Sequence, residues 1–591
     1  MGGRRTKIVA TLGPATDAPG VLEALIRAGV DVVRLNLSHG SREDHARRLR
    51  AARAAAAEAG RHVGAMVDTR GPEVRLGEVA GGGADLVAGA AFVLVAGASG
   101  RTGDASRCGV NHAGLAADVR EGDRVLVDDG RIVLEVVGIE GDEVHTRVAV
   151  GGRITPGRKV QVPGRTLSLP ALSDADADDL AWAAREGVEW AAASFLRDRD
   201  GVLAVRRAIE AAGGQTLVMA KIETVAALDH LDAILAAADG VMVARGDLGV
   251  ELPVEEVPAV QKRIIAAARR LGKPVVTATE MLESMVRSPR PTRAEASDVA
   301  NAVWDGTDAV MLSAETASGA HPLAAVEVMD RICRTTEAAP EFHAYLRAAL
   351  PTPVANATEA VSRATVQVAA DLRADAIVTA TTGGFTARMV ARHRPRTPVV
   401  AVTPSPRVAR ALAVVWGVES LVAPDPTDRA AWEAALDAAV AAGLVRQGAL
   451  AVVTGGAATG ASGATDLLQV RTASPRLAAG RGIGRAQAVG RVLIVNGAED
   501  AARAEADNVI VARSGDVPGF TAALARAAAA VVEEGGLSST AAVAALSLRK
   551  PVVVGAEGAT SRLTAGEWVT VDALRGWVFG GRARLADEPV E

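Results

Sequence analysis

The sequence has 591 residues, more than one hydrophobic core normally serves, and this length predicts about three or four domains. Hydrophobic residues make up 49% and charged residues 23%, which excludes a mainly disordered or fibrous chain, and no apolar run approaches the roughly 20 residues of a membrane helix. The net charge of −5 gives no reason to expect nucleic acid or an anionic membrane as a partner.

The first 330 residues or so alternate short apolar runs with longer helical patterns. A series of strand–helix units predicts a closed parallel (β/α)8 TIM barrel, and continuous apolarity is typical of strands buried on both faces. The expected strands are 7–12, 30–37, 63–68, 189–195, 216–222, 240–245, 274–279 and 308–313, and the expected helices lie near 18–28, 42–59, 174–186, 198–212, 225–238, 254–271, 292–303 and 322–338.

An all-β insertion interrupts the third unit. Residues 72–163 are rich in glycine and valine and contain short strand-like runs and turns. Because the insertion follows a barrel strand, it lies on the catalytic face, where it could close over a site as a lid.

The C-terminal part contains two further α/β regions. The first has strands near 375–380, 398–403, 418–423 and 449–454, and the last alternates valine-rich strands with one alanine-rich helix. We therefore expect a barrel domain over 1–71 and 164–345, an inserted β-barrel lid over 72–163, an α/β regulatory domain over 346–473 and an extra α/β domain over 474–591.

Charged and hydroxyl side chains gather where the expected barrel strands end. Active sites of such barrels form at this edge. A single polar residue at a strand end is explained by its contact with water alone, but polar residues at the ends of several strands indicate a site. These residues are Arg34, Asn36, Ser38 and His39 from the second strand, Asp68–Gly71 from the third, Lys221 and Glu223 from the fifth, Arg245–Asp247 from the sixth, Thr277–Glu280 from the seventh and Ser313–Thr316 from the eighth.

The residue types fit phosphoryl transfer, in which positioning and charge stabilisation supply most of the catalysis. Two carboxylates, Glu223 and Asp247, suit a hard divalent cation such as Mg²⁺. Lys221 and Arg34 offer positive charge to an anionic substrate, and Gly246 lets backbone N–H groups approach a ligand closely. Neutral oxygens with one carboxylate suit a larger, weakly charged cation, and they come from Asn36, Ser38, Asp68 and Thr69.

The chain resembles the pyruvate kinase family over essentially its whole length. The motifs occur in the family's order and spacing, and the last two are too long for chance. They are K-I-V-A-T-L-G-P-A-T (7–16), R-L-N-L-S-H-G (34–40), D-T-R-G-P-E-V-R (68–75), A-K-I-E (220–223), V-A-R-G-D-L-G-V-E (243–251), A-T-E-M-L-E-S-M (278–285) and the run from Pro291 to Ala317.

The resemblance implies transfer of phosphate from phosphoenolpyruvate to ADP, giving pyruvate and ATP, as the last step of glycolysis. It implies Mg²⁺ (or Mn²⁺) and K⁺ as cofactors, a homotetramer, and allosteric activation by a sugar phosphate or nucleotide. A cytoplasmic location is expected, because Cys108 and Cys333 form neither a metal-ligand spacing nor a disulfide framework.

The resemblance also assigns roles to the residues at the barrel edge. Arg34 would hold the transferring phosphoryl group, and Lys221 would neutralise that group and the enolate left behind. The remaining assignments are Glu223 and Asp247 for Mg²⁺, backbone at Gly246 and Asp247 with the Thr279 hydroxyl for the substrate carboxylate, Asn36, Ser38, Asp68 and Thr69 for K⁺, and Arg75, His39, Asn36 and Lys159 for the nucleotide. Thr279 would also lie near the carbon that is protonated, and Glu73 matches the motif form associated with K⁺ dependence.

The chain departs from the family pattern at three points. Glu280 stands where glutamine is common, and Arg70 replaces a usual lysine. The basic stretch of the lid is shorter than usual, so Lys159 could equally be a solvated surface lysine. Six of the 65 basic residues are lysines, so an ammonium retained at Lys221 suggests that an arginine cannot replace it.

Two C-terminal segments bear on regulation. A strand runs into Thr-Thr-Gly-Gly at the start of a helix, which is either a simple capped helix or a phosphate nest; the family resemblance favours an effector site at Thr381, Thr382, Gly384 and Thr386. The last region resembles the swivelling domain of phosphoenolpyruvate-utilising enzymes, but Thr540 occupies the phosphohistidine position, so a structural or regulatory role is expected.

Two other functions compete with an active kinase. One is a phosphoenolpyruvate-sensing regulator with a dead site, which the retained carboxylates and Lys221 disfavour. The other is a phosphotransfer carrier, which Thr540 disfavours because threonine cannot form a reversible phosphoramidate.

Overall fold

The computed structural model describes residues 3–348, 356–423, 431–456, 465–484 and 486–585. The chain divides into two compact units: Met1–Pro353 with Ala391–Arg394 and Ser405–Ser420, and Val354–Val390 with Pro395–Pro404 and Leu421–Glu591. Within the described ranges, no helix has both the length and the apolarity that a membrane crossing requires.

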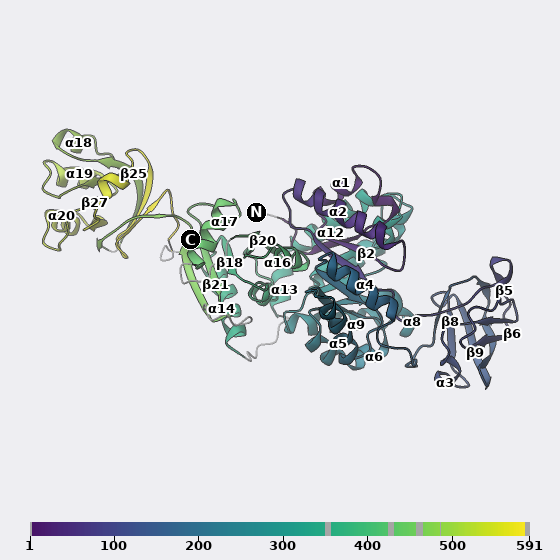
Figure 1. The fold of residues 1–591 in the computed structure, drawn as a ribbon. Coiled ribbons are helices and arrows are strands. Elements are labelled where there is room, and N and C mark those ends of the chain that lie inside the picture. Colours follow the sequence, from purple (N-terminus) through teal and green to yellow (C-terminus); the bar gives the residue numbers. More distant parts are fainter. Residues whose placement is uncertain (1–2, 349–355, 424–430, 457–464, 485, 586–591) are drawn as a thin grey trace. The chain divides into compact units, whose positions relative to one another are not determined.

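Eight parallel strands of the first unit close into a barrel, as the strand–helix alternation predicts (Figure 1). Helices cover the outside and side chains fill the inside, so the strands are almost wholly buried, which explains their continuous apolarity. In the order in which neighbours pair around the ring, the strands are β1 (Lys7–Thr11), β17 (Ala309–Leu312), β16 (Val275–Ala278), β15 (Gly240–Ala244), β14 (Leu217–Ile222), β13 (Trp190–Ala193), β3 (Gly64–Asp68) and β2 (Val32–Asn36).

The helices around the barrel lie close to the predicted ranges. The pattern at 225–238 is two helices, because His230 leaves the helical conformation between them. Three short helices of the described barrel part were not predicted: α8 after β15, α11 after β17 and α13 after α12. The helices are α1 (Val21–Arg27), α2 (Arg42–Glu58), α4 (Asp174–Arg185), α5 (Arg199–Ala211), α6 (Val225–Asp229), α7 (Leu231–Ala237), α8 (Arg245–Glu251), α9 (Val257–Arg270), α10 (Arg293–Asp305), α11 (Ala314–Ala317), α12 (Pro322–Glu337) and α13 (Phe342–Ala348), with 3-10 turns at Pro14–Thr16 and Glu283–Val286.

A buried ion pair closes the N-terminal end of the barrel. Asp308, directly before β17, accepts hydrogen bonds at Oδ1 from Arg394 Nη1 and from the backbone N–H of Trp416, both at 3.0 Å. Its Oδ2 accepts from the backbone N–H of Val275 at 3.1 Å. Arg394 is 1% exposed, so this carboxylate and guanidinium neutralise each other away from water.

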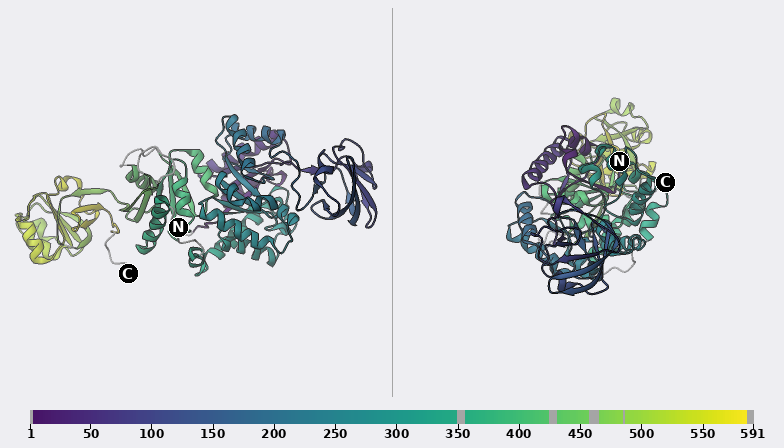
Figure 2. Two further views of the ribbon diagram at one scale, coloured as in Figure 1. Left: turned by 90° about the horizontal axis from the view of Figure 1, so that it is seen from below. Right: turned by 90° about the vertical axis from the view of Figure 1, so that its right-hand side faces the viewer.

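The insertion is built almost entirely from strands, as its composition predicts (Figure 2). Its apolar side chains form a core of their own. One sheet has the order β4 (Val74–Arg75), β12 (Lys159–Gln161), β8 (Arg124–Val127), β9 (Ile132–Glu140), β10 (Glu143–Val150), β6 (Ala91–Val95) and β7 (Arg107–Gly109); β11 (Gly152–Ile154) pairs with β5 (Ala84–Leu86), and a 3-10 turn (Ala80–Gly82) and α3 (Leu115–Asp118) complete it.

The α/β region that follows the barrel contains the four strands predicted for it and one more, β22. Their order is β20 (Val418–Val422), β19 (Val399–Thr403), β18 (Ala376–Ala380), β21 (Leu450–Gly455) and β22 (Leu467–Thr472), the last pair being antiparallel. Its helices are α14 (Ala357–Asp371), α15 (Phe385–Ala391), α16 (Pro406–Ala411) and α17 (Ala431–Ala441), with a 3-10 turn at Leu412–Val414.

Among its described residues, the last region contains four helices, so the expectation of one alanine-rich helix is wrong. That helix is α20 (Thr540–Leu548), while α18 (Ala498–Ala502), α19 (Phe520–Arg526) and α21 (Ala559–Arg562) are too short to show a helical period. The sheet has the order β23 (Arg476–Ala479), β30 (Trp577–Gly580), β29 (Trp568–Asp572), β25 (Gln487–Ile494), β26 (Asn508–Ala512), β27 (Ala529–Val532), β28 (Val552–Val554) and β24 (Arg481–Ile483).

Candidate active site

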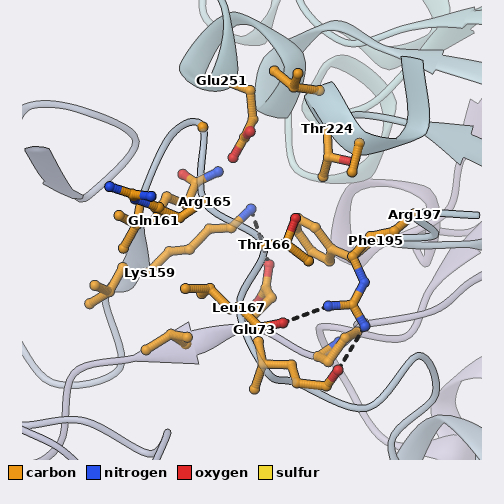
Figure 3. A pocket seen from close by; sticks show the side chains of 18 of the residues that line it. Glu73, Lys159, Gln161, Arg165, Thr166, Leu167, Phe195, Arg197, Thr224 and Glu251 are labelled. Carbon is orange, nitrogen blue, oxygen red and sulfur yellow. Dashed lines mark hydrogen bonds and ion pairs between the residues drawn. The ribbon is translucent and has the colours of Figure 1, made fainter. Parts of the chain in front are cut away.

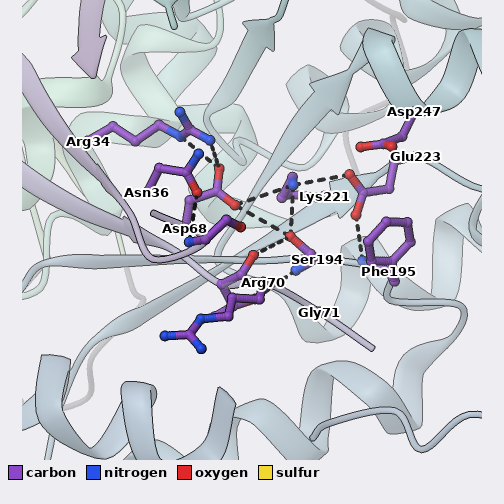
Figure 4. A network of polar contacts seen from close by, with 12 residues as sticks. Arg34, Asn36, Asp68, Arg70, Gly71, Ser194, Phe195, Lys221, Glu223 and Asp247 are labelled. Carbon is purple, nitrogen blue, oxygen red and sulfur yellow. Dashed lines mark hydrogen bonds and ion pairs between the residues drawn. The ribbon is translucent and has the colours of Figure 1, made fainter. Parts of the chain in front are cut away.

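Arg34 and Lys221 converge on the carboxylate of Asp68 at the C-terminal edge of the barrel (Figure 4). Arg34 Nε and Nη2 both lie 2.7 Å from Asp68 Oδ2, and Lys221 Nζ lies 3.3 Å from Oδ1. Burial favours the neutral acid, but the two cations outweigh burial and hold the pKa of Asp68 below its ordinary value. The aspartate is therefore ionised and fixes both cations.

The Lys221 ammonium has three oxygen neighbours. Besides Asp68, it lies 3.1 Å from Glu223 Oε2 and donates a hydrogen bond to Ser194 Oγ at 2.8 Å. Burial alone would lower the pKa of Lys221, but Asp68 and Glu223 raise it above its ordinary value. The side chain is therefore a permanent cation inside the barrel rim.

Glu223 is fully buried and incompletely satisfied. Its Oε1 accepts the backbone N–H of Phe195 at 2.5 Å, whereas its Oε2 accepts no hydrogen bond from the described residues. Burial, aided by the charge of Asp247, raises the pKa of Glu223 although Lys221 opposes the change. A further cation beside Glu223 and Asp247 would relieve both effects, so this donor set fits a divalent ion that takes few protein ligands. Within the described residues, no three acidic, histidine or cysteine side chains gather around one point.

Helix α8 places Gly246 and Asp247 in its first turn, where backbone N–H groups have no partner inside the helix. The N–H of Gly246 donates to Thr279 Oγ1 at 2.8 Å, which brings the sixth and seventh strand ends together. Arg245 fixes the same loop, because its Nη2 donates to Thr279 O at 2.6 Å and its Nη1 lies 2.7 Å from Asp298 Oδ1.

Three non-glycine residues at this rim have left-handed backbone conformations. They are Phe195 (φ 56°), Thr279 (φ 65°) and Glu280 (φ 54°). Each costs about 1–3 kcal/mol, and such strain persists where the surrounding structure holds a functional loop. Glu280 itself is exposed.

Lys159 is a half-buried ion-pair partner, so its interpretation as a solvated surface lysine is wrong. Its ammonium contacts Asp247, lies 3.3 Å from Glu73 Oε1 and stands 4.5 Å from the centre of the Phe195 ring, and the side chain is 13% exposed. Lys159 and Phe195 face a cavity of about 190 Å³ that Glu251 also lines (Figure 3). Burial raises the pKa of Glu251 to about 7.

Four predicted residues lie outside this network. Asn36 pairs in register with Asp68, and its Oδ1 accepts the N–H of Ser38 at 3.2 Å. His39 is exposed, and its carbonyl is bonded by a ring nitrogen of His45. Arg75 donates to Gly157 O at 2.8 Å and pairs with Glu73. No contact joins His39 or Arg75 to Lys221 in the part of the chain that the structure describes.

Two residues of the network were missed because the first and fourth strand ends were not considered. Thr11, which ends β1, accepts a hydrogen bond from Arg34 Nη1 at 3.0 Å. Ser194, directly after β13, bonds Lys221. Glu315, at the end of the eighth strand, was expected in the site but binds backbone instead: its carboxylate accepts hydrogen bonds from the N–H groups of Leu282 and Ser313.

The predicted effector loop and the swivelling-type region lie in the second unit. The N–H of Gly384 donates to Thr381 Oγ1 at 2.9 Å, Thr386 Oγ1 bonds Thr465 Oγ1 at 2.9 Å, and Thr382 is exposed. Thr540 Oγ1 donates to Asp516, so its hydroxyl is already engaged at the start of α20.

The other four lysines have no part in the site. Lys7 is buried and donates to Val418 O, whereas Lys262 is 56% exposed beside Asp305. Lys273 and Lys550 are half-buried and donate to backbone carbonyls, each at 2.6 Å.

Comparison with known families gives three matches along the chain. They are the barrel domain of pyruvate kinase over residues 3–326, the alpha/beta domain of pyruvate kinase over residues 359–471, and the mobile domain of PEP-utilising enzymes over residues 505–576. The first match alone covers more than half of the 591 residues.

Individual proteins are similar over the full length. A pyruvate kinase of Geobacillus stearothermophilus is 44% identical and one of Bacillus licheniformis is 43% identical, each over 98% of this chain and 100% of the relative. The crystal structure of a pyruvate kinase from Cryptosporidium parvum superposes with a TM-score of 0.74 at 35% identity, covering 79% of this chain and 96% of that one.

Proposed function

The chain belongs to the pyruvate kinase family, and we propose that its barrel site transfers the phosphoryl group of phosphoenolpyruvate to ADP through the residues described above. Pyruvate kinase is a phosphotransferase whose substrates are phosphoenolpyruvate and ADP and whose products include pyruvate. The observation that supports the site most directly is the buried network in which Arg34, Lys221 and Glu223 meet.

The reaction needs positive charge at two points. An oxygen of the ADP β-phosphate attacks the phosphorus, the bond from phosphorus to the enol oxygen breaks, and the enolate takes up a proton at its terminal carbon. Arg34 would hold the phosphoryl group, and Lys221 would neutralise the enolate oxygen as it develops charge. The Thr279 hydroxyl and the N–H groups at Gly246 and Asp247 would hold the substrate carboxylate.

A divalent cation, Mg²⁺ or Mn²⁺, would bind Glu223 and Asp247. When bound, it would make the enolate a better leaving group by neutralising its oxygen. Glu223 offers a buried oxygen without a hydrogen bond, which suits that role. Lys159 contacts Asp247, so its ammonium would neutralise charge next to a cation held there and would be available to a nucleotide phosphate.

A monovalent cation, K⁺, would bind Asn36, Ser38, Asp68 and Thr69. Asn36 and Asp68 stand side by side on β2 and β3, so a neutral oxygen and a carboxylate share one level of the barrel. The nucleotide would meet Arg75, His39, Asn36 and Lys159. Neither His39 nor Arg75 contacts Lys221. These two residues would therefore join the site only through a nucleotide that spans the distance to Lys221.

Regulation and assembly extend the proposal. A phosphorylated effector, a sugar phosphate or a nucleotide, would bind the loop with Thr381, Thr382, Gly384 and Thr386, where the exposed Thr382 offers a free face. The chain would act as a cytoplasmic homotetramer with the domain boundaries 1–71 with 164–345, 72–163, 346–473 and 474–591. Light scattering after size exclusion tests the tetramer, and activation by a panel of sugar phosphates and nucleoside monophosphates, lost in Thr382→Glu, tests the loop.

A coupled assay for pyruvate tests the central proposal. The assay compares Mg²⁺ with a chelator and K⁺ with tetramethylammonium at equal ionic strength. We expect turnover that requires both cations, and Glu223→Gln should raise the Mg²⁺ concentration needed for half-maximal rate. No turnover with both cations and the effector panel present would refute it.

A further inference from the structure

Ser194 occupies a junction between two parts of the site. The residue is 4% exposed and directly follows β13. Its hydroxyl accepts a hydrogen bond from Lys221 Nζ at 2.8 Å and donates to the backbone carbonyl of Thr69 at 2.7 Å (Figure 4). Its backbone N–H donates to Thr69 Oγ1 at 3.1 Å. One serine therefore bonds the ammonium on one side and the carbonyl and hydroxyl of Thr69 on the other.

The direction of these bonds is fixed by chemistry. An ammonium can only donate, so the serine oxygen must accept from Lys221. The single hydroxyl proton then goes to Thr69 O, because the alternative acceptor, Asp68 Oδ1, is 3.4 Å away. Lys221 thus has one neutral acceptor at 2.8 Å and two carboxylates at 3.1 and 3.3 Å. Without the serine, carboxylates alone would set the ammonium's position.

We propose that Ser194 is a positioning residue that orients the Lys221 ammonium and links it to Thr69, so that monovalent-cation binding and stabilisation of the enolate are coupled. The proposal rests on the functions proposed above for Lys221 and Thr69. A serine with only a structural role would also be buried and bonded, but its loss would change stability and leave cation dependence unaltered.

The first test compares Ser194→Ala with Thr216→Val. Thr216 is buried directly before β14 and donates to Val188 O at 2.9 Å, so its replacement also removes a buried hydroxyl from the barrel, but at the opposite end of the strand from Lys221. We expect Ser194→Ala to lower kcat about 10- to 100-fold and to raise the K⁺ concentration for half-maximal rate several-fold, with the KM for ADP unchanged. Thr216→Val should leave all three quantities at their parent values.

A second readout does not depend on turnover. An ion that binds only the folded state stabilises it, and more so the tighter it binds. K⁺ should therefore raise the Tm of the parent and of Thr216→Val relative to tetramethylammonium. This increase should shrink in Ser194→Ala. If that variant does not fold, Ser194→Cys replaces it, because a thiol has nearly the same size but is a weak acceptor; it should show the same changes at smaller size.

The double variant decides whether Ser194 acts through Lys221. Lys221→Met should lower kcat strongly, and adding Ser194→Ala should lower it no further, because residues that act as a unit are not additive. Parent kcat and K⁺ dependence in Ser194→Ala, or an equal further loss in the Lys221→Met background, would overturn the proposal. Parent activity in Lys221→Met itself would instead refute the function proposed for Lys221.

Discussion

Replacing Gly246 with alanine tests whether the fold or a bound ligand requires a glycine at this position. A Cβ at this position would meet Thr279 atoms at 3.6–3.8 Å, which is ordinary van der Waals contact, and the backbone is not left-handed. Alanine is favoured over glycine inside a helix by about 1 kcal/mol. The free protein should therefore be as stable as the parent or slightly more stable.

The effect on catalysis should have the opposite sign. If the N–H groups of α8 bind the substrate carboxylate, the new methyl group stands between them and the ligand. Loss of one charge-assisted hydrogen bond costs about 1.5–3 kcal/mol. Because each 1.4 kcal/mol is about a factor of ten, kcat/KM for phosphoenolpyruvate should fall roughly 10- to 150-fold.

The measurement pairs a coupled assay with urea unfolding, and Gly249→Ala is the matched control. Gly249 lies three residues further along α8, and a Cβ there would meet only a Val257 methyl carbon at 3.9 Å. Both variants share the gain in helix propensity, but only Gly246→Ala should lose kcat/KM. Unchanged kcat/KM in Gly246→Ala, or an equal loss in Gly249→Ala, would refute the close-approach role.

Three further outcomes are expected. Arg394→Met should lower the free energy of unfolding by about 3 kcal/mol, measured by denaturant titration, because it leaves Asp308 buried without its cation. A buried pair that loses one partner costs about 3–5 kcal/mol, and the lower figure is expected because the variant also removes a repulsion. That repulsion acts on Arg269, whose pKa is lowered to about 9 by burial and by Arg394. Folding raises the pKa of Glu251 from 4.5 to about 7 and so disfavours its charged form; the stability of the protein should therefore fall as pH rises from about 4.5 to 7. Glu251→Gln should be more stable than the parent at pH 8, by on the order of 1 kcal/mol. Unfolding titrations across pH should show this difference vanishing towards pH 4.5. Lys159→Met should raise the KM for ADP about tenfold with little change in the KM for phosphoenolpyruvate, since one charged contact is lost; equal changes in both constants would contradict its assignment to the nucleotide.

The barrel could be predicted from the sequence because its signal is repeated. Eight apolar runs, each followed by a helical period, leave few alternatives for the fold, and the predicted strand and helix ranges agree with those observed to within a few residues. Helix α8 escaped prediction because its seven residues, R-G-D-L-G-V-E, include two glycines and show no period. The short helices of the last region were missed for the same reason.

The site was predicted from the rule that active sites of such barrels form at the C-terminal ends of the strands, and only for the strands to which the rule was applied. Applied also to β1 and β13, the same rule finds Thr11 and Ser194. It could not distinguish Glu315, which supports backbone, from Glu223, because both are carboxylates at strand ends. Nor could it place Lys159, whose contact with Asp247 joins residues 88 positions apart and depends on how the insertion returns to the barrel.

The scarcity of lysine has a practical consequence for chemical labelling. Five of the six lysine side chains are buried or half-buried, and most of these ammonium groups are held by carboxylates or carbonyls, whereas Lys262 is 56% exposed. Among the lysines, amine-reactive dyes and cross-linkers should therefore attach mainly to Lys262 on α9. A fluorophore could be placed there without engineering, while lysine-based cross-linking maps of this enzyme would report on almost nothing else.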